Sequence, residues 1–397
     1  MSNRAENGAG MKILQVIDMF SPSAGGSADV ASRLSQALSR RGHEVTIFTS
    51  NYRLEQGYTK TLPGVKVYAA HNYLSPGGKP LLMPGILTTS KRELRDFDII
   101  HLHNYPTIPN IMVHRYARQY HIPYVLQAHG SLATYFQKGT LKRVYDRLRG
   151  QEILKDAAKV IAVAPAEAET YRSMGVAGDK IEIIPNGVDA SEFESLPPRG
   201  EFRKKHGLQN QKVIFYLGRI HATKGLHLLA GAFAALLREK GDARLIIAGP
   251  DDGYLTELKK LIKRLQIEEK TLFTGPLYGQ DKIQAIVDAD VFVMPSAYEI
   301  FGIAVLEACV CGTPVIVTDR CGIAPEITGD MGQVIGYDES ALQGALLKAL
   351  AAPPPDEASK EKGRQALLAR FSWQKLAVEI ENIYRGIVAG KESRKPA

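Results

Sequence analysis

Residues 290–319 have the sequence DVFVMPSAYEIFGIAVLEACVCGTPVIVTD. The outer segments, 290–296 and 313–319, are short apolar runs of the kind that form buried strands, and the segment 301–312 between them has helical spacing. Strands that are buried on both faces are typical of parallel sheets, in which a helix connects one strand to the next. The stretch therefore predicts one strand–helix–strand unit of an α/β protein with a doubly wound sheet.

The same alternation continues on both sides of residues 185–200, a segment rich in Pro, Gly, Ser and Asp that is typical of a linker. The other predicted strands are MKILQVI, EVTIFTS, VKVYAA, FDIIHLH, YVLQAH and KVIAVAP before this segment, and KVIFYLG, ARLIIAG and TLFTG after it. We therefore expect two doubly wound, Rossmann-like domains, residues 11–190 and 191–372, that face a ligand-binding cleft. Residues 1–10 are polar and small and are predicted to form a disordered tail.

The composition is that of a globular protein, since 45% of the 397 residues are hydrophobic and 23% are charged. Three cysteines without metal-ligand spacing indicate reduced thiols, and we recognise neither a signal peptide nor an apolar run of the ~20 residues that span a bilayer. These features predict a cytoplasmic protein. The net charge of +8 is compatible with nucleic acid, anionic lipid or phosphorylated ligands, so the positions of the cations have to decide.

Small and polar residues follow the predicted strands at the carboxyl ends, where doubly wound sheets bind ligands. Gly25 and Gly26 precede a predicted helix, so the backbone can approach a phosphate closely and the first helical N–H groups are available to it. The alternative is a flexible turn. His129 follows another strand in the motif AHGS and is a candidate ligand contact, as is His103; the alternative is a histidine whose hydrogen bonds are all made within a loop.

Two cations follow the predicted strand at 212–218. Arg219 and Lys224 are five residues apart in a turn that leads into a helix, a placement that suits a diphosphate because arginine offers a forked donor and lysine a compact charge. The alternative is a pair of solvated surface cations. Their position at the ligand edge of the sheet favours the diphosphate.

Two glutamates lie in the stretch quoted first. Glu299 is in the predicted strand-to-helix loop, and Glu307 is about a turn and a half into the helix. A carboxylate accepts two hydroxyl hydrogen bonds, so one glutamate suits a sugar and the other a ribose, while the amides of residues 301–304 at the helix start suit phosphates. The alternative is that Glu299 caps the helix and Glu307 is solvated.

The sequence Asp288–Ala289–Asp290 matches the D-x-D pattern with which metal-dependent sugar transferases hold a divalent ion. Here it precedes a predicted strand, at the edge of the sheet opposite the ligand. We interpret the two aspartates as helix-end and turn residues and predict no metal site, because Arg219 and Lys224 can neutralise a diphosphate instead.

Together, the motifs GRIHATKG, PSAYEIFGIAVLEA, AHGS and IIPNGVD and the Gly25–Gly26 pair resemble glycosyltransferase family 4 over residues 11–390. The resemblance implies the GT-B architecture and a retaining, nucleotide-sugar-dependent transferase. It implies that Arg219 and Lys224 bind the donor diphosphate, that Glu307 binds the ribose and that Glu299 binds the transferred sugar. The other implied contacts are the amides of Phe301, Gly302 and Ile303, the glycines Gly25 and Gly26 at the phosphates, and His129 at the reacting face of the sugar.

The resemblance also implies that the helix at 373–390 returns to the first domain. The implied reaction moves a sugar from a UDP- or GDP-linked donor to a hydroxyl of a glycan or lipid-linked glycan in polysaccharide biosynthesis, with no metal and no cofactor. A nucleotide-sugar 2-epimerase of the same architecture is the alternative. An NAD-dependent oxidoreductase would require G-x-G-x-x-G after the first strand, and a nucleic-acid-binding protein would require aromatic stacking platforms; we find neither, so no nucleic-acid partner is expected.

Residues 131–155 carry six basic and two acidic side chains beside an apolar stripe. A basic amphipathic helix of this kind can lie on an anionic membrane surface, so peripheral membrane association is a hypothesis. The alternative is a surface helix whose apolar stripe faces the core of the protein.

Overall fold

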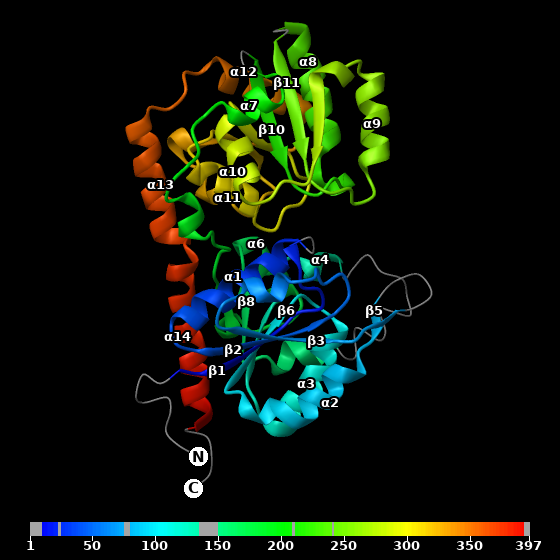
Figure 1. Cartoon of the computed structure of the whole chain (residues 1–397), viewed down its shortest axis with the longest axis vertical. Helices are drawn as coiled ribbons and strands as arrows, with labels where there is room; N and C mark the ends of the chain where they lie inside the picture. Colours follow the sequence, from blue (N-terminus) through cyan, green and yellow to red (C-terminus); the bar gives the residue numbers. More distant parts are fainter. Residues whose placement is uncertain are drawn as a thin grey trace. The chain divides into compact units, whose positions relative to one another are not determined.

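The computed structural model describes residues 10–22, 25–74, 80–134, 150–208, 211–239 and 242–392. The chain forms two compact units. The N-terminal unit extends to Gly187 and includes the segment from Trp373 onward, and the C-terminal unit comprises Val188–Ser372. Each unit is a parallel sheet flanked by helices (Figure 1).

The N-terminal unit contains a seven-stranded sheet of order β3-β2-β1-β6-β7-β8-β9, in which every neighbouring pair is parallel. Its strands are β1 (Lys12–Val16), β2 (Glu44–Ser50), β3 (Val65–Ala70), β6 (Ile99–His103), β7 (Tyr124–Gln127), β8 (Lys159–Ala162) and β9 (Ile181–Ile183). Its helices include α1 (Gly26–Arg40), α2 (Pro84–Glu93), α3 (Ile108–Tyr120), α4 (Ser131–Thr134), α6 (Pro165–Ser173) and α14 (Trp373–Glu392), and residues 150–156 are also helical. A short antiparallel pair, β4 (Tyr73–Leu74) and β5 (Pro80–Leu82), stands apart from the sheet.

The strands of this sheet bury both faces. Leu14 and Val16 of β1 pack in a core cluster with Ile86 of α2 and Val113 of α3. Because successive side chains alternate between the two faces of a strand, Gln15 lies on the other face. Helices α2 and α3 pack against each other, and so do α1 and α14, with the strands drawn between α1 and the α2–α3 pair (Figure 1).

Helix α14 is held to the N-terminal unit by polar contacts as well as by apolar ones. The hydroxyl of its buried Tyr384 lies 2.6 Å from Nδ1 of His101 on β6. The Glu381 carboxylate contacts the side chains of Arg41, His43 and Arg385. Burial alone would raise the pKa of Glu381, but the hydrogen bonds from these three side chains lower it to about 2.

The C-terminal unit contains a six-stranded parallel sheet of order β12-β11-β10-β13-β14-β15. Its strands are β10 (Lys212–Leu217), β11 (Ala243–Ala248), β12 (Thr271–Gly275), β13 (Val291–Met294), β14 (Val315–Thr318) and β15 (Gly332–Ile335). Its helices among the described residues are α7 (Glu201–Lys205), α8 (Leu226–Glu239), α9 (Leu255–Arg264), α10 (Gly279–Asp288), α11 (Ile303–Val310), α12 (Glu339–Ala351) and α13 (Glu357–Phe371). Helix α8 packs against α9 and α12, and α11 packs against α13.

The predicted α/β class with two doubly wound sheets is confirmed, and each strand predicted from an apolar run is present. The stretch quoted first forms β13, α11 and β14, as predicted. Sequence patterns missed β9 and β15, which are three and four residues long, and the pair β4–β5. Strands this short show too little periodicity to be recognised.

The three cysteines are buried, and none forms a disulfide. Burial raises the pKa of the Cys309 thiol to about 12 and that of Cys321 to about 11, so both are protonated at neutral pH. Within the described ranges, no group of three or more His, Cys, Asp or Glu side chains could hold a metal ion. In the same ranges, no helix has the length and apolar character needed to cross a bilayer. The basic segment proposed to contact membranes falls largely on residues 135–149, outside the described residues, so that hypothesis stays a prediction.

Candidate active site

Lys224 and Glu299 are in direct contact. Lys224 ends a short 3-10 helix, Ala222–Lys224, after β10, and Glu299 lies in the loop after β13. Lys224 Nζ donates to Glu299 Oε2 over 2.6 Å, and only 11% and 15% of the two side chains are exposed. Since neither charge is fully hydrated, each depends on the other for compensation. The two residues assigned from the sequence to the diphosphate and to the sugar therefore form one ion pair.

The backbone brings these two loops together at Gly225. Its φ of +67° is in the left-handed region, and a Cβ atom built there would lie 1.8 Å from the carbonyl oxygen of Pro295. Only glycine permits so close an approach. Beside it, the Ala297 N–H donates to the Thr223 carbonyl over 2.9 Å. This contact sets Lys224 opposite Glu299.

The loop that carries Glu299 is fixed by the strand on its other side. The Glu299 N–H donates to the Arg320 carbonyl (3.2 Å), and the Gly322 N–H donates to the Glu299 carbonyl (2.8 Å). Gly302, with φ +100°, is the N-cap of α11, and the buried Phe301 ring packs against Phe371 with the ring centroids 6.4 Å apart. The loop is therefore anchored on both sides of its carboxylate.

Phe301, Gly302 and Ile303, whose amides were predicted to assist, stand at the start of α11. The first amides of a helix have no partner within it, and the helix dipole places partial positive charge there. This end of α11 lies between Glu299 in the loop and Glu307 in the helix, as the sequence indicated. The arrangement suits an anionic group flanked by hydroxyl-bearing ones.

Glu307 is 8% exposed, and it forms an ion pair with Lys282 of α10. The solvated alternative considered for Glu307 is therefore wrong. Sequence reasoning missed Lys282, although it is a cation in a helix that follows the end of β12, the same rule that selected Arg219 and Lys224. The compensated charge explains how an apolar helix tolerates the carboxylate.

Arg219 is the most exposed of the predicted donor-binding side chains. More than half of it is accessible, and its guanidinium contacts Asp252, which follows β11. The Arg219 carbonyl accepts a hydrogen bond from the Tyr216 hydroxyl over 2.9 Å, which anchors the backbone that carries the exposed guanidinium. An exposed ion pair of this kind is worth about 0–1 kcal/mol, so an anionic ligand can displace Asp252 readily.

The two aspartates of the D-x-D sequence serve the fold. Asp288, the last residue of α10, is fully buried and accepts from the backbone N–H groups of Gly200 (2.5 Å) and Arg203 (3.0 Å). Asp290 contacts the Arg203 guanidinium over 2.6 Å and accepts from the Val213 N–H. The hydrogen bond from the Val213 N–H and the charges of Arg203 and Arg199 lower the pKa of Asp290 despite its burial. Their placement before β13 agrees with the interpretation as helix-end and turn residues.

In the N-terminal unit, the paired glycines stand where α1 begins. Gly26 is the first residue of α1 and Gly25 is its N-cap, with φ +97°. The Gly25 carbonyl accepts from the N–H groups of Ala28 and Asp29. A Cβ atom at Gly25 would meet nothing within 4 Å, so conformation rather than space requires glycine at this position. The amides at the start of α1 suit a phosphate, as predicted from the sequence.

His129 lies just after β7 in a strained turn. Its φ is +52° and that of Gly130 is +82°, so two successive residues adopt the left-handed conformation. His129 Nε2 lies 2.9 Å from Nδ1 of His103, the last residue of β6. Burial lowers the pKa of His129 to about 3, so its imidazole is neutral at pH 7. The side chain is thus a hydrogen-bonding group rather than a cation.

Family comparisons cover both units of the chain. A model described as "Glycosyltransferase Family 4" matches residues 24–192, and one described as "Glycosyl transferases group 1" matches residues 198–366. The chain belongs to glycosyltransferase family 4. The two matched regions contain all of the site residues predicted from the sequence.

Several curated proteins resemble this glycosyltransferase over nearly its whole length. An uncharacterised glycosyltransferase of Methanocaldococcus jannaschii is 28% identical, over 94% of this chain and 98% of its own. The alpha-monoglucosyldiacylglycerol synthase of Streptococcus pneumoniae is 28% identical, over 87% and 79% respectively. A GDP-mannose-dependent alpha-(1-6)-phosphatidylinositol dimannoside mannosyltransferase of Mycobacterium tuberculosis is 25% identical, over 93% and 95%.

Solved structures share the GT-B fold. The crystal structure of Anabaena HepE in complex with UDP and glucose matches with a TM-score of 0.76 at 20% identity, over 94% of this chain and 99% of that one. The sucrose-phosphate synthase of Thermosynechococcus elongatus matches with a TM-score of 0.75 at 22% identity, over 96% and 100%. At these identities the likeness shows the fold alone.

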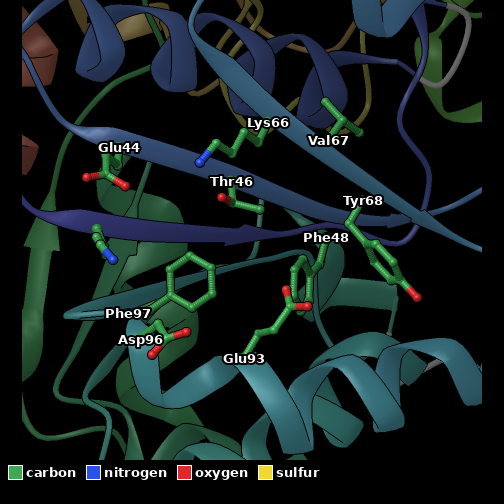
Figure 2. Close-up of a pocket in the computed structure, with 10 residues that line it drawn as sticks. Glu44, Thr46, Phe48, Lys66, Val67, Tyr68, Glu93, Asp96 and Phe97 are labelled. Atoms are coloured by element: carbon green, nitrogen blue, oxygen red, sulfur yellow. The ribbon is translucent and has the colours of Figure 1, made fainter.

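One pocket of the glycosyltransferase, of about 300 Å³, is separate from these residues. Figure 2 shows it in the N-terminal unit, between β2, β3 and the end of α2, with Phe48, Tyr68 and Phe97 among its lining residues. Lys12 and Glu44, which also line it, are the first residues of their strands. The predicted ligand contacts follow the carboxyl ends of the strands, so this pocket is not the candidate site.

Proposed function

We propose that the glycosyltransferase moves a sugar, with retention of anomeric configuration and without a metal ion, from a UDP- or GDP-linked donor to a hydroxyl acceptor. The acceptor class we propose is a glycan or lipid-linked glycan of cell-surface polysaccharide synthesis. The observation that carries this proposal is the start of α11, where helical amides lie between two ion-paired glutamates at the carboxyl edge of the sheet.

This site matches the parts of a nucleotide-diphosphate sugar. The amides at Phe301–Ile303 and the cations Arg219 and Lys224 suit the diphosphate. Glu307 suits the vicinal hydroxyls of ribose, and Glu299 suits hydroxyls of the transferred sugar. When the ligand arrives, hydroxyl and phosphate groups replace the partners that the charged side chains now have.

The chemistry follows from the charge that develops in the reaction. The bond between the anomeric carbon and the diphosphate oxygen breaks, and its electron pair leaves with the diphosphate. That negative charge is stabilised by Arg219, Lys224 and the α11 amides. These groups thereby take the place of the metal ion used by other transferases. The acceptor hydroxyl attacks from the same face and gives its proton to the departing phosphate oxygen, so Glu299 positions the sugar and forms no bond to it. Gly25 and Gly26 contribute backbone contacts to the phosphates, and His129 contacts the reacting sugar.

The relatives support the reaction class and differ in the details. The names of the pneumococcal and mycobacterial enzymes specify glycolipid products, and the mycobacterial name specifies GDP-mannose. The HepE complex contains UDP. A lipid-linked acceptor therefore has support from two relatives, whereas the nucleotide needs a direct measurement.

A donor panel tests the proposal. Melting temperatures are measured with UDP-, GDP- and ADP-sugars, with and without EDTA, because a ligand that binds only the native state raises its melting temperature. The stabilising donor is then incubated with candidate acceptors, and the anomeric configuration of the product is read by NMR. An inverted product, or transfer that EDTA abolishes, would contradict the proposed mechanism. An epimer formed without acceptor would instead indicate the 2-epimerase.

A further inference from the structure

Three imidazoles form a row on one face of the N-terminal sheet. His101 and His103 are two residues apart on β6 and therefore share a face, and His129 follows the neighbouring strand β7. The ring centroids of His101 and His103 are 4.3 Å apart, and those of His103 and His129 are 5.2 Å apart. In both pairs the ring planes are within 9° of parallel. Only His129 belongs to the site assigned above, so the other two rings need an explanation.

Burial keeps all three rings neutral. It lowers the pKa of His101 and of His129 to about 3, and it lowers that of His103 well below the usual value. A neutral imidazole carries a proton on one nitrogen and a lone pair on the other, so each ring has one donor nitrogen and one acceptor nitrogen. The hydrogen bonds that the rings make determine which nitrogen of each ring is protonated.

Gln15 of β1 determines which nitrogen of His103 is protonated. Its side-chain oxygen Oε1 lies 2.7 Å from Nε2 of His103. An amide oxygen can only accept, so His103 carries its proton on Nε2 and has its lone pair on Nδ1. That lone pair accepts from His129 Nε2 over 2.9 Å, so the His129 proton is on Nε2. The remaining nitrogen, Nδ1 of His129, is therefore a bare acceptor; it is buried and has no partner among the described residues.

The turn that carries His129 is clamped on both sides by α6. The Ala128 N–H donates to the Tyr171 hydroxyl over 3.0 Å, and the Gly130 N–H donates to the buried Glu167 carboxylate over 2.6 Å. These contacts hold the backbone of the left-handed turn, and the hydrogen bond to His103 and the stacking on its ring orient the imidazole. Buried polar atoms normally have a hydrogen-bond partner, so an oriented acceptor that lacks a donor needs an explanation.

We propose that Gln15, acting through His103, is a positioning residue that holds His129 in the Nε2–H tautomer. The bare Nδ1 then accepts a hydrogen bond from a hydroxyl of the transferred sugar. The contact between Nδ1 and the sugar rests on the proposed function, whereas the assignment of the tautomer rests only on the hydrogen bonds of the structure. In this arrangement Gln15 of β1 and His103 of β6 determine which nitrogen His129, which follows β7, offers to the ligand.

The tautomer is measured directly on the full-length chain with ¹⁵N-labelled histidine. Two-bond ¹H–¹⁵N correlation spectra distinguish a protonated Nε2 from a protonated Nδ1. The chain has 10 histidines, and the His129 signals are assigned as those that disappear in His129→Gln. We expect His129 and His103 both as Nε2–H tautomers. A protonated Nδ1 on His129 would show that the Gln15 amide is turned the other way and would overturn the proposal.

Two matched variants test the role of Gln15. Gln15→Met keeps the length of the side chain and removes the acceptor, so His129 should become a mixture of tautomers. Gln127→Met makes the same change on β7, where the buried Gln127 is the register partner of His103 but its side chain contacts His101. Among the described residues its side chain makes no hydrogen bond to His103 or His129, so the change should leave the His129 tautomer unchanged. Should Gln15→Met fail to fold, Gln15→Asn withdraws the amide by one carbon with less loss of polarity. An unchanged tautomer in a folded Gln15 variant would contradict the assigned role.

The contact with the sugar is tested separately. With the donor found in the panel, Gln15→Met should lower kcat/KM about tenfold, the effect of one weakened hydrogen bond, and leave the affinity for UDP and GDP unchanged. A changed tautomer with normal kcat/KM would refute the sugar contact and keep the positioning role. If no donor is transferred at all, the proposed function has failed, while the spectra still decide the tautomer.

Discussion

Removing the charge of Glu299 tests the central contact of the proposed site. The pair with Lys224 spans 2.6 Å, and its side chains are 11% and 15% exposed. Breaking a buried ion pair costs about 3–5 kcal/mol, and the residual exposure reduces the expected loss in Glu299→Gln to about 2–3 kcal/mol. Domains are stable by about 5–15 kcal/mol, so the variant should still fold.

The effect on function should divide between turnover and binding. If Glu299 holds the transferred sugar, its loss removes a charge-assisted hydrogen bond of about 1.5–3 kcal/mol, which lowers kcat about 10- to 150-fold. The released Lys224 remains available to the diphosphate, so UDP or GDP should bind at least as tightly as to the wild type. Lys224→Met should show the opposite pattern, with weaker binding of the nucleoside diphosphate.

The assay combines denaturant unfolding, calorimetric titration with UDP and GDP, and steady-state kinetics with the donor that the panel identifies. Glu326→Gln is the matched control, because it breaks a more exposed ion pair with Arg370 in the same unit, and neither side chain is among the predicted site residues. The control should lose less than about 1 kcal/mol and keep its turnover. Near-normal kcat in Glu299→Gln would refute the assignment of this residue to the sugar.

Three further variants make independent predictions. Glu307→Gln should weaken UDP or GDP binding about 10-fold or more while leaving inorganic pyrophosphate binding nearly unchanged, since pyrophosphate has no ribose; equal losses for both ligands in titrations would contradict the ribose role. Gly225→Ala should lower the free energy of unfolding by several kcal/mol more than Gly253→Ala does. Both glycines have positive φ, but only at Gly225 would a Cβ atom lie 1.8 Å from the Pro295 carbonyl oxygen. Similar denaturation midpoints for the two variants would rule out the steric explanation. Glu381 has a folded-state pKa of about 2, below its ordinary value of 4.5, so its contribution of about 3 kcal/mol is present above pH 4.5 and is lost as the pH falls toward 2. The stability difference between wild type and Glu381→Gln should therefore shrink over that range in acid-titrated unfolding, and a constant difference would show that the carboxylate is not responsible.

Local sequence was sufficient for the elements and for the edge of the sheet at which chemistry is expected. Apolar runs such as residues 291–294 predict strands because a strand buried on both faces must be apolar throughout. Glycines with a required conformation, such as Gly302 before α11, mark the loops. Since all strands of a parallel sheet end at one edge, residues such as Lys224 and Glu299 could be selected before their partners were known.

The tertiary structure alone decided which side chains meet. Lys224 and Glu299 are 75 residues apart, and their contact exists because β10 and β13 are neighbours in the sheet, an order that sequence periodicity does not encode. The same holds for Lys282 beside Glu307, which explains how an apolar helix retains a carboxylate. The tautomer of His129 is the clearest case, because it depends on the side-chain oxygen of Gln15, which lies two strands away in the sheet. No local sequence pattern contains that contact. Sequence determines which groups are available at the sheet edge, and the strand order determines which of them share a proton or a charge.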